Sequence, residues 1–528
     1  MPGEHVAVKW PKLPCMDEQA EAIAFLADPA THGLDGPAVE RIDTHASSVF
    51  LAGERAFKLK RAVRYSYLDY STVALREAAC RAEFEINRRI APSLYLGVRA
   101  IRRRADGSVG FDGAGETVDW VLEMRRFAAA GLFDRLAEAG ALSPALLRDL
   151  ADAIAAFHAA AEPVTTLGGS AGIARVIDGN AENFRAAREI LDQTACARLE
   201  RAQRAALAAC ADLLDRRRAR GRVRRCHGDL HLGNICLVDG KPTLFDAVEF
   251  SAAISSIDVL YDLAFLLMDL IHRKLDAGAN FVMNRYLDLA RDDDGIKALP
   301  LFLSLRAAIR AHVTAAAAPR QRSDQQRRRA ASAARRYLAL AETLLAPAAP
   351  RLVAVGGLSG SGKSTIAQAL APDLPPPPGA RVLRSDVLRK ALLDVPPETR
   401  LPPAAYSHAM NKQIYAALLQ GAAHLLDAGA SVVLDATFID PKDRAAAEQV
   451  AKNARVPFAG LWLAARPQVM AARLEERRGD ASDATAAVLE RQLESDPGAV
   501  TWSRIESGGP LARVTAAARR AAGIAPRS

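Results

Sequence analysis

Cysteine and aromatic residues are scarce in this chain of 528 residues, and no hydrophobic run is long enough to span a membrane. The six cysteines are scattered without a Cys-x-x-Cys pair, which argues against a disulfide framework and favours reduced thiols. The longest apolar stretch, residues 259–271, is interrupted by Asp262 and Asp269, whereas a membrane-spanning helix needs about 20 apolar residues. The N-terminal segment has no apolar signal core and no cleavage site. We therefore expect a cytoplasmic protein that has no membrane partner.

The overall composition is that of a folded protein. Half of the residues are hydrophobic and a quarter are charged, which excludes collagen-like chains and wholesale disorder. At roughly 100–200 residues per domain, the length predicts two to four domains. The 70 basic and 61 acidic residues leave a net charge of +9. This mild excess suits anionic ligands such as nucleotides, but alone it does not indicate binding to DNA or RNA.

A proline-rich segment, residues 346–350, indicates a linker between two domains. The β-branched run that follows it predicts a buried strand at residues 352–355. We place the domain boundary near residue 347, which gives domains of residues 1–346 and 347–528. Just before the linker, residues 319–336 form a basic run. That run is either the solvated face of a helix or a contact surface for a polyanion.

A phosphate-binding motif directly follows the strand at 352–355. Residues 357–365 read Gly-Leu-Ser-Gly-Ser-Gly-Lys-Ser-Thr and fit the pattern G-x-x-x-x-G-K-[ST]. Backbone N–H groups of such a loop point at phosphate oxygens, and the N-terminus of the following helix adds its positive dipole. We expect Lys363 to reach the β- and γ-phosphates and Ser364 to ligate Mg²⁺. The expected nucleotide-binding residues are Gly357, Ser359, Gly360, Ser361, Gly362, Lys363, Ser364 and Thr365.

Two acidic residues follow later strands of this domain. Residues 381–386 predict a second strand ending at Asp386, and residues 431–437 predict a third that carries Asp435. Parallel sheets present their ligands at the carboxyl ends of their strands. Asp435 is therefore a candidate Mg²⁺ ligand. Asp386 is a candidate base for a substrate hydroxyl, or alternatively only the N-cap of the next helix.

An arginine-rich segment, residues 473–478, follows a further strand at residues 460–464. It resembles the lid of small-molecule P-loop kinases, in which arginines close over the transferred phosphoryl group; a solvated helix face is the alternative. Residues 351–505 as a whole resemble the P-loop kinase group that includes gluconate kinase, polynucleotide kinase and the zeta toxins. The resemblance implies an α/β P-loop NTPase domain with a mainly parallel sheet and a catalytic role for Arg478.

The first domain carries a second set of oxygen ligands. Residues 227–234 read His-Gly-Asp-Leu-His-Leu-Gly-Asn, and Asp246 follows twelve residues after Asn234. Such a set supplies a base, Asp229, and two ligands for Mg²⁺, Asn234 and Asp246. The pair His227 and His231 lacks the helical H-E-x-x-H context of a zinc site, so His227 is expected to orient the loop.

These motifs resemble the aminoglycoside phosphotransferase and choline kinase group. The resemblance implies an α+β, protein-kinase-like bilobal domain that uses ATP and Mg²⁺. It also implies an upstream Lys–Glu ion pair. The hairpin at residues 47–60 offers Lys58 or Lys60, of which we favour Lys58. The helix at residues 73–90 offers Glu77, Glu83 and Glu85, and we favour Glu83 over Glu77.

The strand at residues 120–125 fits the segment that receives adenine through backbone groups, and we assign this role to Glu123 and Met124, although a plain strand would look the same. No G-x-G-x-x-G motif precedes Lys58. We therefore expect Ser47, Ser48 and backbone N–H groups to cover the phosphates instead.

The acceptor region of the first domain shows no acidic cluster beyond residues 292–294. A polycationic aminoglycoside would require several carboxylates, so we expect an anionic or neutral acceptor. Arg306 and Arg310 lie one helical turn apart and either clamp an anionic group or belong to a packed helix.

The order of the two domains resembles the bacterial proteins called bifunctional aminoglycoside phosphotransferase/ATP-binding proteins. The sequence thus predicts a kinase: an ATP- and Mg²⁺-dependent phosphotransferase with two nucleotide sites, acting on hydroxyl groups of small molecules. Two alternatives stay open. One is a nucleotide-gated regulatory or toxin–antitoxin-like module. The other is a polynucleotide-end kinase, which would give the basic run a nucleic-acid partner.

Overall fold

The computed structural model describes residues 19–35, 39–44, 46–65, 68–249, 251–321, 323–476 and 481–525. The chain forms two compact units. The first combines Met1–Leu142 with Arg225–Ser256, and the second combines Ser143–Arg224 with Ile257–Ser528. The domain boundary expected near residue 347 falls in a stretch without helix or strand and stays a prediction.

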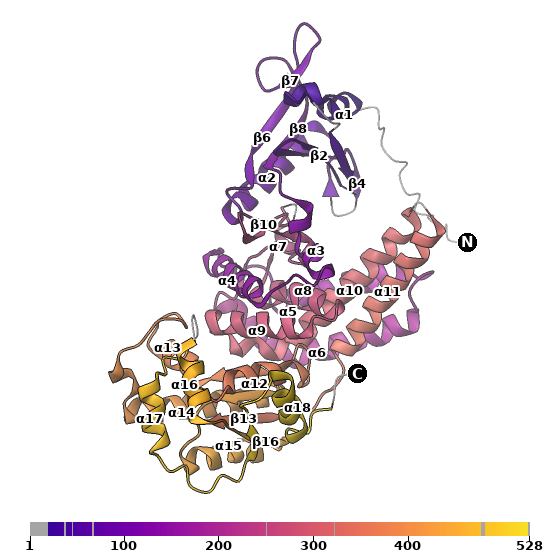
Figure 1. The fold of residues 1–528 in the computed structure, drawn as a ribbon. Coiled ribbons are helices and arrows are strands. Elements are labelled where there is room, and N and C mark those ends of the chain that lie inside the picture. Colours follow the sequence, from indigo (N-terminus) through magenta and orange to yellow (C-terminus); the bar gives the residue numbers. More distant parts are fainter. Residues whose placement is uncertain are drawn as a thin grey trace, which may run out of the picture. The chain divides into compact units, whose positions relative to one another are not determined.

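An antiparallel sheet of six strands, in the order β1-β2-β3-β8-β6-β7, forms the centre of the first unit (Figure 1). Successive side chains of a strand point to opposite faces. Phe57 and Leu59 of β3 therefore join the core beside α1, whereas Lys58 and Lys60 face the other way. The elements of this unit are α1 (Ala20–Ala27), η1 (Pro29–His32), β1 (Glu40–Asp43), β2 (Ser47–Ala52), β3 (Arg55–Lys60), β4 (Arg64–Tyr65), β5 (Leu68–Asp69), α2 (Val73–Ile90), β6 (Tyr95–Arg103), β7 (Val109–Phe111), β8 (Glu116–Arg125), η2 (Ala129–Gly131), α3 (Phe133–Glu138), η3 (Leu232–Asn234), β10 (Ile235–Val238), β11 (Lys241–Leu244) and α7 (Ala252–Ser255).

Helix α2 lies against this sheet and carries polar residues on its buried face. Thr72 caps its N-terminus by accepting a hydrogen bond from the Leu75 amide at 3.2 Å. The helix then runs over the residues expected from the sequence, 73–90. Its buried side chains, Arg76, Cys80, Glu83 and Asn87, recur at helical spacing on one face. Buried polar groups need partners, so this face already indicates a functional region.

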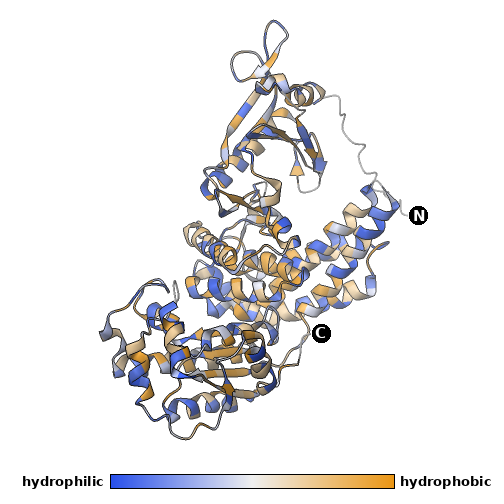
Figure 2. Cartoon of the chain, in the orientation of Figure 1, coloured by the Kyte–Doolittle hydropathy of each residue, from blue (hydrophilic) through white to orange (hydrophobic). Residues whose placement is uncertain are grey.

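The helical part of the second unit surrounds α8, whose residues Val259–Ile271 are all buried. Figure 2 shows hydrophobic residues along α8 and the neighbouring α10. Among the described residues, the stretch Asp293–Arg320 is long and apolar enough to cross a membrane by composition. However, 61% of its 18-residue apolar window is buried, as in a core helix of a soluble protein. The elements are α4 (Pro144–Ala160), α5 (Gly169–Ala186), α6 (Gln193–Ala219), α8 (Val259–His272), α9 (Asp276–Ala290), η4 (Asp293–Ala298), α10 (Leu299–Ala317), η5 (Ala318–Arg320) and α11 (Asp324–Leu344). Two short strands, β9 (Val223–Arg225) and β12 (Ser256–Asp258), contain the residues at which the chain passes between the units.

The remainder of the second unit is built on a five-stranded sheet in the order β14-β15-β13-β16-β17. Every neighbouring pair is parallel, which confirms the α/β class expected from the sequence. Helices α12 and α18 pack on one face of β13, and Trp462 and Trp502 pack near Gly356. The elements are β13 (Leu352–Gly357), α12 (Lys363–Leu370), η6 (Ala371–Asp373), β14 (Arg381–Arg384), α13 (Ser385–Leu392), η7 (Pro403–Tyr406), α14 (His408–Asp427), β15 (Val432–Asp435), α15 (Pro441–Ala454), β16 (Phe458–Ala464), α16 (Pro467–Glu476), α17 (Ala486–Leu493), β17 (Ser503–Glu506) and α18 (Leu511–Ala521).

Candidate active sites

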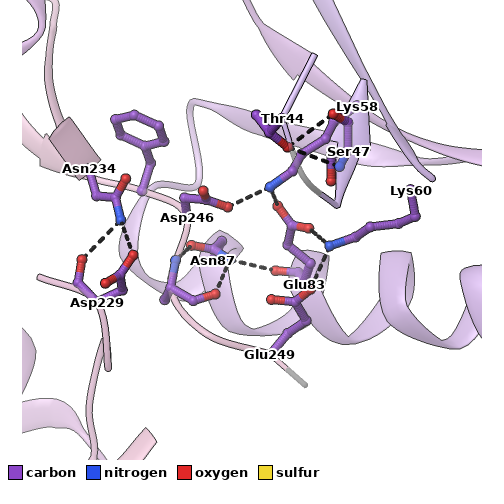
Figure 3. Close-up of polar contacts among 12 residues, drawn as sticks. Thr44, Ser47, Lys58, Lys60, Glu83, Asn87, Asp229, Asn234, Asp246 and Glu249 are labelled. Carbon is purple, nitrogen blue, oxygen red and sulfur yellow. Dashed lines mark hydrogen bonds and ion pairs between the residues drawn. The ribbon is translucent and has the colours of Figure 1, made fainter. Parts of the chain in front are cut away.

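A buried carboxylate, Glu83, joins two lysines in the first unit (Figure 3). Its Oε1 lies 2.8 Å from Lys58 Nζ, and its Oε2 lies 2.5 Å from Lys60 Nζ. Each lysine has a second acidic partner at 2.5 Å, Asp246 for Lys58 and Glu249 for Lys60. Burial alone would lower the pKa of Lys58, but the carboxylates of Asp246 and Glu83 outweigh it and raise that pKa. Both lysines are therefore held as ammonium ions on the same side of the sheet.

Glu83 meets both candidate lysines, whereas Glu77 pairs at 2.9 Å with Arg81 on the exposed side of α2. The geometry thus brings the favoured pair, Lys58 and Glu83, together. Lys60 contacts the same carboxylate, so the two lysines differ in their second acidic partner: Asp246 for Lys58 and Glu249 for Lys60.

The backbone at Asp246 is held in an unusual conformation. Its φ is +63°, in the left-handed region that non-glycine residues rarely adopt. The Tyr95 hydroxyl accepts a hydrogen bond from the Asp246 amide at 3.0 Å, and the Asn87 side chain accepts one from the Ala247 amide at 2.9 Å. Conformations of this kind cost about 1–3 kcal/mol and occur where the surroundings enforce them. Asn87 and Tyr95 thus position the Asp246 carboxylate. Sequence reasoning did not assign them this role, although Asn87 lies one turn after Glu83.

Hydrogen bonds inside the loop at 227–234 orient Asp229. The Asn234 amide nitrogen, Nδ2, donates to the Asp229 carboxylate at 3.0 Å and to its backbone oxygen at 2.9 Å. His227 Nδ1 accepts from the Asp229 amide at 3.3 Å, so its Nε2 donates to the Phe245 carbonyl at 2.9 Å. His227 is thus an orienting residue, as expected. In Figure 3, Asp246 lies between the Asp229–Asn234 pair and the Lys58–Glu83 pair.

The expected phosphate-covering residues lie on β2, close to the preceding turn. The Ser47 amide donates a hydrogen bond to the Thr44 hydroxyl oxygen at 3.0 Å. The Ser48 hydroxyl donates to Asp43 at 2.7 Å. Both serines are buried and are hydrogen-bonded to Thr44 and Asp43. Their contact with phosphate stays a prediction.

Glu123 and Met124, to which the adenine contact is assigned, lie on β8 between two neighbouring strands. Met124 pairs with Ala56 of β3 on one side and with Tyr95 of β6 on the other. Glu123 likewise pairs with residues of both neighbouring strands. A strand between two partners uses its backbone groups in the two ladders. The adenine contact of Glu123 and Met124 stays a prediction.

The motif at 357–365 runs from the last residue of β13 through a loop at 358–362 into the first turn of α12, as expected. Gly360 and Gly362 have φ angles of +80° and +92°. A Cβ atom at Gly360 would lie 2.4 Å from the Met470 carbonyl oxygen, so the loop needs glycine at this position. Helix α12 begins at Lys363, and its N-terminus therefore points its amides at the loop.

Ser364 and Asp435, the two expected Mg²⁺ ligands of this domain, lie in direct contact. The Ser364 hydroxyl donates to Asp435 Oδ2 at 2.6 Å. Arg384, from the end of β14, donates to the Ser364 hydroxyl at 3.2 Å and lies 3.3 Å from Asp435. Sequence reasoning missed Arg384. Its place two residues before Asp386, at the carboxyl end of a strand, is the signal that could have revealed it.

Asp386 lies in the first turn of α13 rather than at the end of a strand, because β14 stops at Arg384. The helix N-cap is Arg384, and no side chain caps the helix, so the alternative role of Asp386 as N-cap is wrong. Burial raises the pKa of the Asp386 carboxyl, and the Ser482 hydroxyl and Arg384 oppose that shift. A carboxyl with a raised pKa is a suitable proton acceptor.

One cavity of about 1700 Å³ is lined by the phosphate-binding loop, Asp386 and Asp435. Within it, Arg473 of α16 donates to the Ser507 carbonyl at 2.8 Å, and the Gln492 side chain accepts from the Ser359 amide at 2.8 Å. Arg478 lies outside the described residues. The cavity is lined by most of the residues that were expected from the sequence to have a role in this domain: Ser359, Gly360, Ser361, Gly362, Lys363, Ser364, Thr365, Asp386, Asp435 and Arg473.

The anion clamp suggested for Arg306 and Arg310 is wrong for Arg306. This side chain is only 3% exposed, and its guanidinium lies 3.9 Å from the centre of the Tyr261 ring. Its Nε donates to the Tyr261 carbonyl at 3.1 Å. Arg310 lies over the ring of Tyr337 at 5.6 Å. The packed-helix alternative is therefore correct, and this pair gives no support for an anionic acceptor.

Comparison with known proteins identifies two family domains. Residues 72–299 match the family described as phosphotransferase enzyme family, and residues 352–496 match the family described as AAA domain. The uncharacterized protein Rv2004c of Mycobacterium tuberculosis is 33% identical over 493 residues, which cover 91% of this chain and 94% of that protein. An uncharacterized protein of Mycobacterium bovis, Mb2027c, matches to the same extent.

Solved structures resemble the two parts of the chain separately. A gluconokinase from Sinorhizobium meliloti 1021 is 24% identical, with a TM-score of 0.25, and covers 33% of this chain and 93% of its own. A choline/ethanolamine kinase family protein from Mesorhizobium loti is 17% identical, with a TM-score of 0.34, and covers 61% of this chain and 99% of its own. The two family matches and the full-length relatives show that the chain belongs to the family in which an aminoglycoside-phosphotransferase-type domain is joined to a P-loop kinase domain, and that it is a kinase.

Proposed function

We propose that the protein is an ATP- and Mg²⁺-dependent kinase with two nucleotide sites, each of which transfers a γ-phosphoryl group to a hydroxyl of a small molecule. One observation carries this proposal. Each unit brings together, from distant parts of its own sequence, a lysine, an acidic base candidate and a pair of oxygen donors. In the first unit these are Lys58, Asp229 and the pair Asn234 and Asp246.

The second unit supplies the equivalent groups around the P-loop. They are Lys363, Asp386 and the pair Ser364 and Asp435, all of which line one cavity. A regulatory module that only binds nucleotide would not need an acidic base candidate beside the phosphate loop. The presence of Asp386 and Asp229 therefore favours transfer over binding alone.

The residues of both sites fit Mg²⁺, which prefers oxygen ligands and few protein groups beside the phosphates. In the first site, Asn234 Nδ2 already donates to Asp229, which leaves its amide oxygen to serve as the ligand with Asp246. In the second site, Ser364 and Asp435 would hold the ion. Bound Mg²⁺ would neutralise negative charge on the phosphates.

Transfer in the first site assigns one task to each side chain. Asp229, held by Asn234, accepts the proton of the acceptor hydroxyl while that oxygen bonds to the γ-phosphorus and ADP leaves. Lys58, positioned by Glu83, offers its charge to the nucleotide phosphates. In the second site, Asp386 is the corresponding base and Lys363 meets the phosphates. Arg473 and Arg478 are proposed to stabilise the charge that develops during transfer.

We further propose that the protein acts in the cytoplasm on small metabolites. The test is a screen of hydroxyl-bearing metabolites for ATP-dependent phosphorylation, performed with the full chain and with Asp229→Ala and Lys363→Ala. We expect each site to have its own acceptor, so that one product disappears in each variant. Absence of any phosphorylated product, together with unchanged ATP turnover in both variants, would contradict the proposal.

A further inference from the structure

Strand β14 is an edge strand of the parallel sheet, so the outward-facing groups of its backbone need partners from outside the sheet. Two asparagines of α9 supply them. The Val382 amide donates to Asn284 Oδ1 at 2.7 Å. The Ala380 carbonyl accepts from Asn284 Nδ2 at 3.1 Å and from Asn280 Nδ2 at 3.0 Å. Side-chain amides of a helix thus take the place of a neighbouring strand.

The residue before Ala380 makes this close approach possible. Gly379 has a φ of +116°, and a Cβ atom there would lie 2.7 Å from Asn280 Nδ2 and 2.5 Å from the Ala371 carbonyl oxygen. Any other residue would push the asparagine away from the strand. The contact between α9 and the chain before β14 therefore requires glycine at position 379.

A buried ion pair network extends the same contact. Arg381, the first residue of β14, lies 2.7 Å from Asp288 and 2.7 Å from Asp293. Asn280, Asn284 and Asp288 recur every four residues and therefore share one face of α9. Asn280 is buried and Asn284 and Asp288 are half-buried, which distinguishes this face from an ordinary solvated helix face.

The same helix also contacts the segment between α13 and η7. Arg285 lies 2.6 Å from Glu398, and Arg291, which follows α9, lies 2.9 Å from Asp394. This segment leads to Arg400 and Leu401, which line the cavity of the P-loop site. Helix α9 therefore holds two parts of that site, although by sequence it belongs to the phosphotransferase family match at 72–299.

We infer that α9 is a positioning element of the P-loop site and that Asn284 is its central residue. Strand β14 ends at Arg384, which contacts Ser364 and Asp435, and Asp386 follows two residues later. A displacement of β14 would therefore move both groups relative to the phosphate loop. The inference rests on the function proposed above for the P-loop site.

The expected effect separates turnover from nucleotide affinity. The phosphate loop joins β13 to α12, so it does not depend on β14 for its conformation. Arg384 and Asp386 do depend on β14. A misplacement of about 1 Å can lower turnover by about 100-fold. For Asn284→Ala we expect kcat for ATP hydrolysis to fall by about 10-fold or more, with KM for ATP changed by less than about 3-fold.

The test uses the full chain carrying Asp229→Ala, so that the first site is silent, with ATP as the probe and water as the acceptor. Hydrogen–deuterium exchange of the peptide covering residues 380–386 is measured in parallel. The matched control is Asn183→Ala, because Asn183 also lies in a helix and its side chain donates to the Gly179 carbonyl of its own helix, at 2.8 Å. Asn284→Asp serves as the conservative variant, since it keeps an oxygen that can accept from the Val382 amide.

We expect faster exchange of residues 380–386 and a lower kcat in Asn284→Ala, intermediate values in Asn284→Asp, and no change in Asn183→Ala. If exchange or kcat in Asn284→Ala equals that of Asn183→Ala, the inference is overturned. It is also overturned if KM rises as much as kcat falls, because the effect would then extend to the nucleotide pocket. Lys363→Ala in the same background distinguishes the two claims: if that variant leaves turnover unchanged, the function proposed for the P-loop site is wrong.

Discussion

Replacing Glu83 by Gln should destabilise the first unit. The carboxylate of Glu83 is fully buried and lies within 2.8 Å of Lys58 and 2.5 Å of Lys60. Glutamine keeps the shape but removes the negative charge, which leaves two neighbouring buried ammonium groups with one acidic partner each.

The magnitude follows from the burial and the remaining partners. Removing one member of a buried ion pair costs about 3–5 kcal/mol. Since Lys58 keeps Asp246 and Lys60 keeps Glu249, each at 2.5 Å, we expect the lower end of this range, about 3 kcal/mol. The control is Glu77→Gln on the same helix. Its partner Arg81 is solvent-exposed, so this change should cost about 0.3–0.5 kcal/mol.

Hydrogen–deuterium exchange of the peptide covering α2, residues 73–90, measures this difference in the full chain. A loss of about 3 kcal/mol lowers protection by about 150-fold, whereas Glu77→Gln should lower it by less than about 3-fold. In a Lys363→Ala background, Glu83→Gln should also raise KM for ATP at the first site, because Lys58 loses the group that positions it. Equal protection and equal KM in the two variants would refute the role assigned to Glu83.

Two further predictions concern metal binding and pH. Asp246→Ala should weaken binding of Mg²⁺ and a non-hydrolysable ATP analogue to the first site by about 10-fold or more, because it removes a metal ligand. Asp229→Asn should slow transfer with little effect on binding. The measurement is calorimetric titration in a Lys363→Ala background, and equal losses of binding in the two variants would show that these roles are wrong. Burial lowers the pKa of His312 to about 4, whereas about 6.5 is expected in the unfolded chain. Between these two pH values the unfolded state binds more protons than the folded state. The free energy of unfolding therefore decreases as the pH falls below about 6.5. This loss should reach about 2 kcal/mol at pH 5 and should be absent in His312→Gln; parallel pH profiles of unfolding for the two proteins would contradict it.

The motifs with fixed spacing were predictable from the sequence because their geometry is local. The loop at 357–365 folds between a strand and a helix, and the pair Asp229 and Asn234 forms within one short loop. Alternation along β3 placed Lys58 and Lys60 on one face. It could not reveal that Glu83 bonds to both, because that arrangement depends on how α2 packs against the sheet.

The errors arose where tertiary contacts decide the outcome. Glu123 and Met124 lie on a strand as expected; that this strand pairs on both sides is not visible in a single-strand pattern, and their contact with adenine stays a prediction. Arg306 has the spacing of a ligand-binding arginine, yet Tyr261 and Phe265 enclose it. Arg384 was missed because its importance depends on the contact with Ser364, twenty residues away in sequence.

The number of nucleotides bound per chain tests the central claim most directly. Calorimetric titration of the full chain with Mg²⁺ and a non-hydrolysable ATP analogue should give two sites per chain. Lys363→Ala should leave only the first site, whose affinity Asp246→Ala weakens by about 10-fold or more, and the double variant should have neither site at full affinity. Binding of a single nucleotide to the unmodified chain, or loss of all binding in either single variant, would contradict the account of two independent phosphotransfer sites.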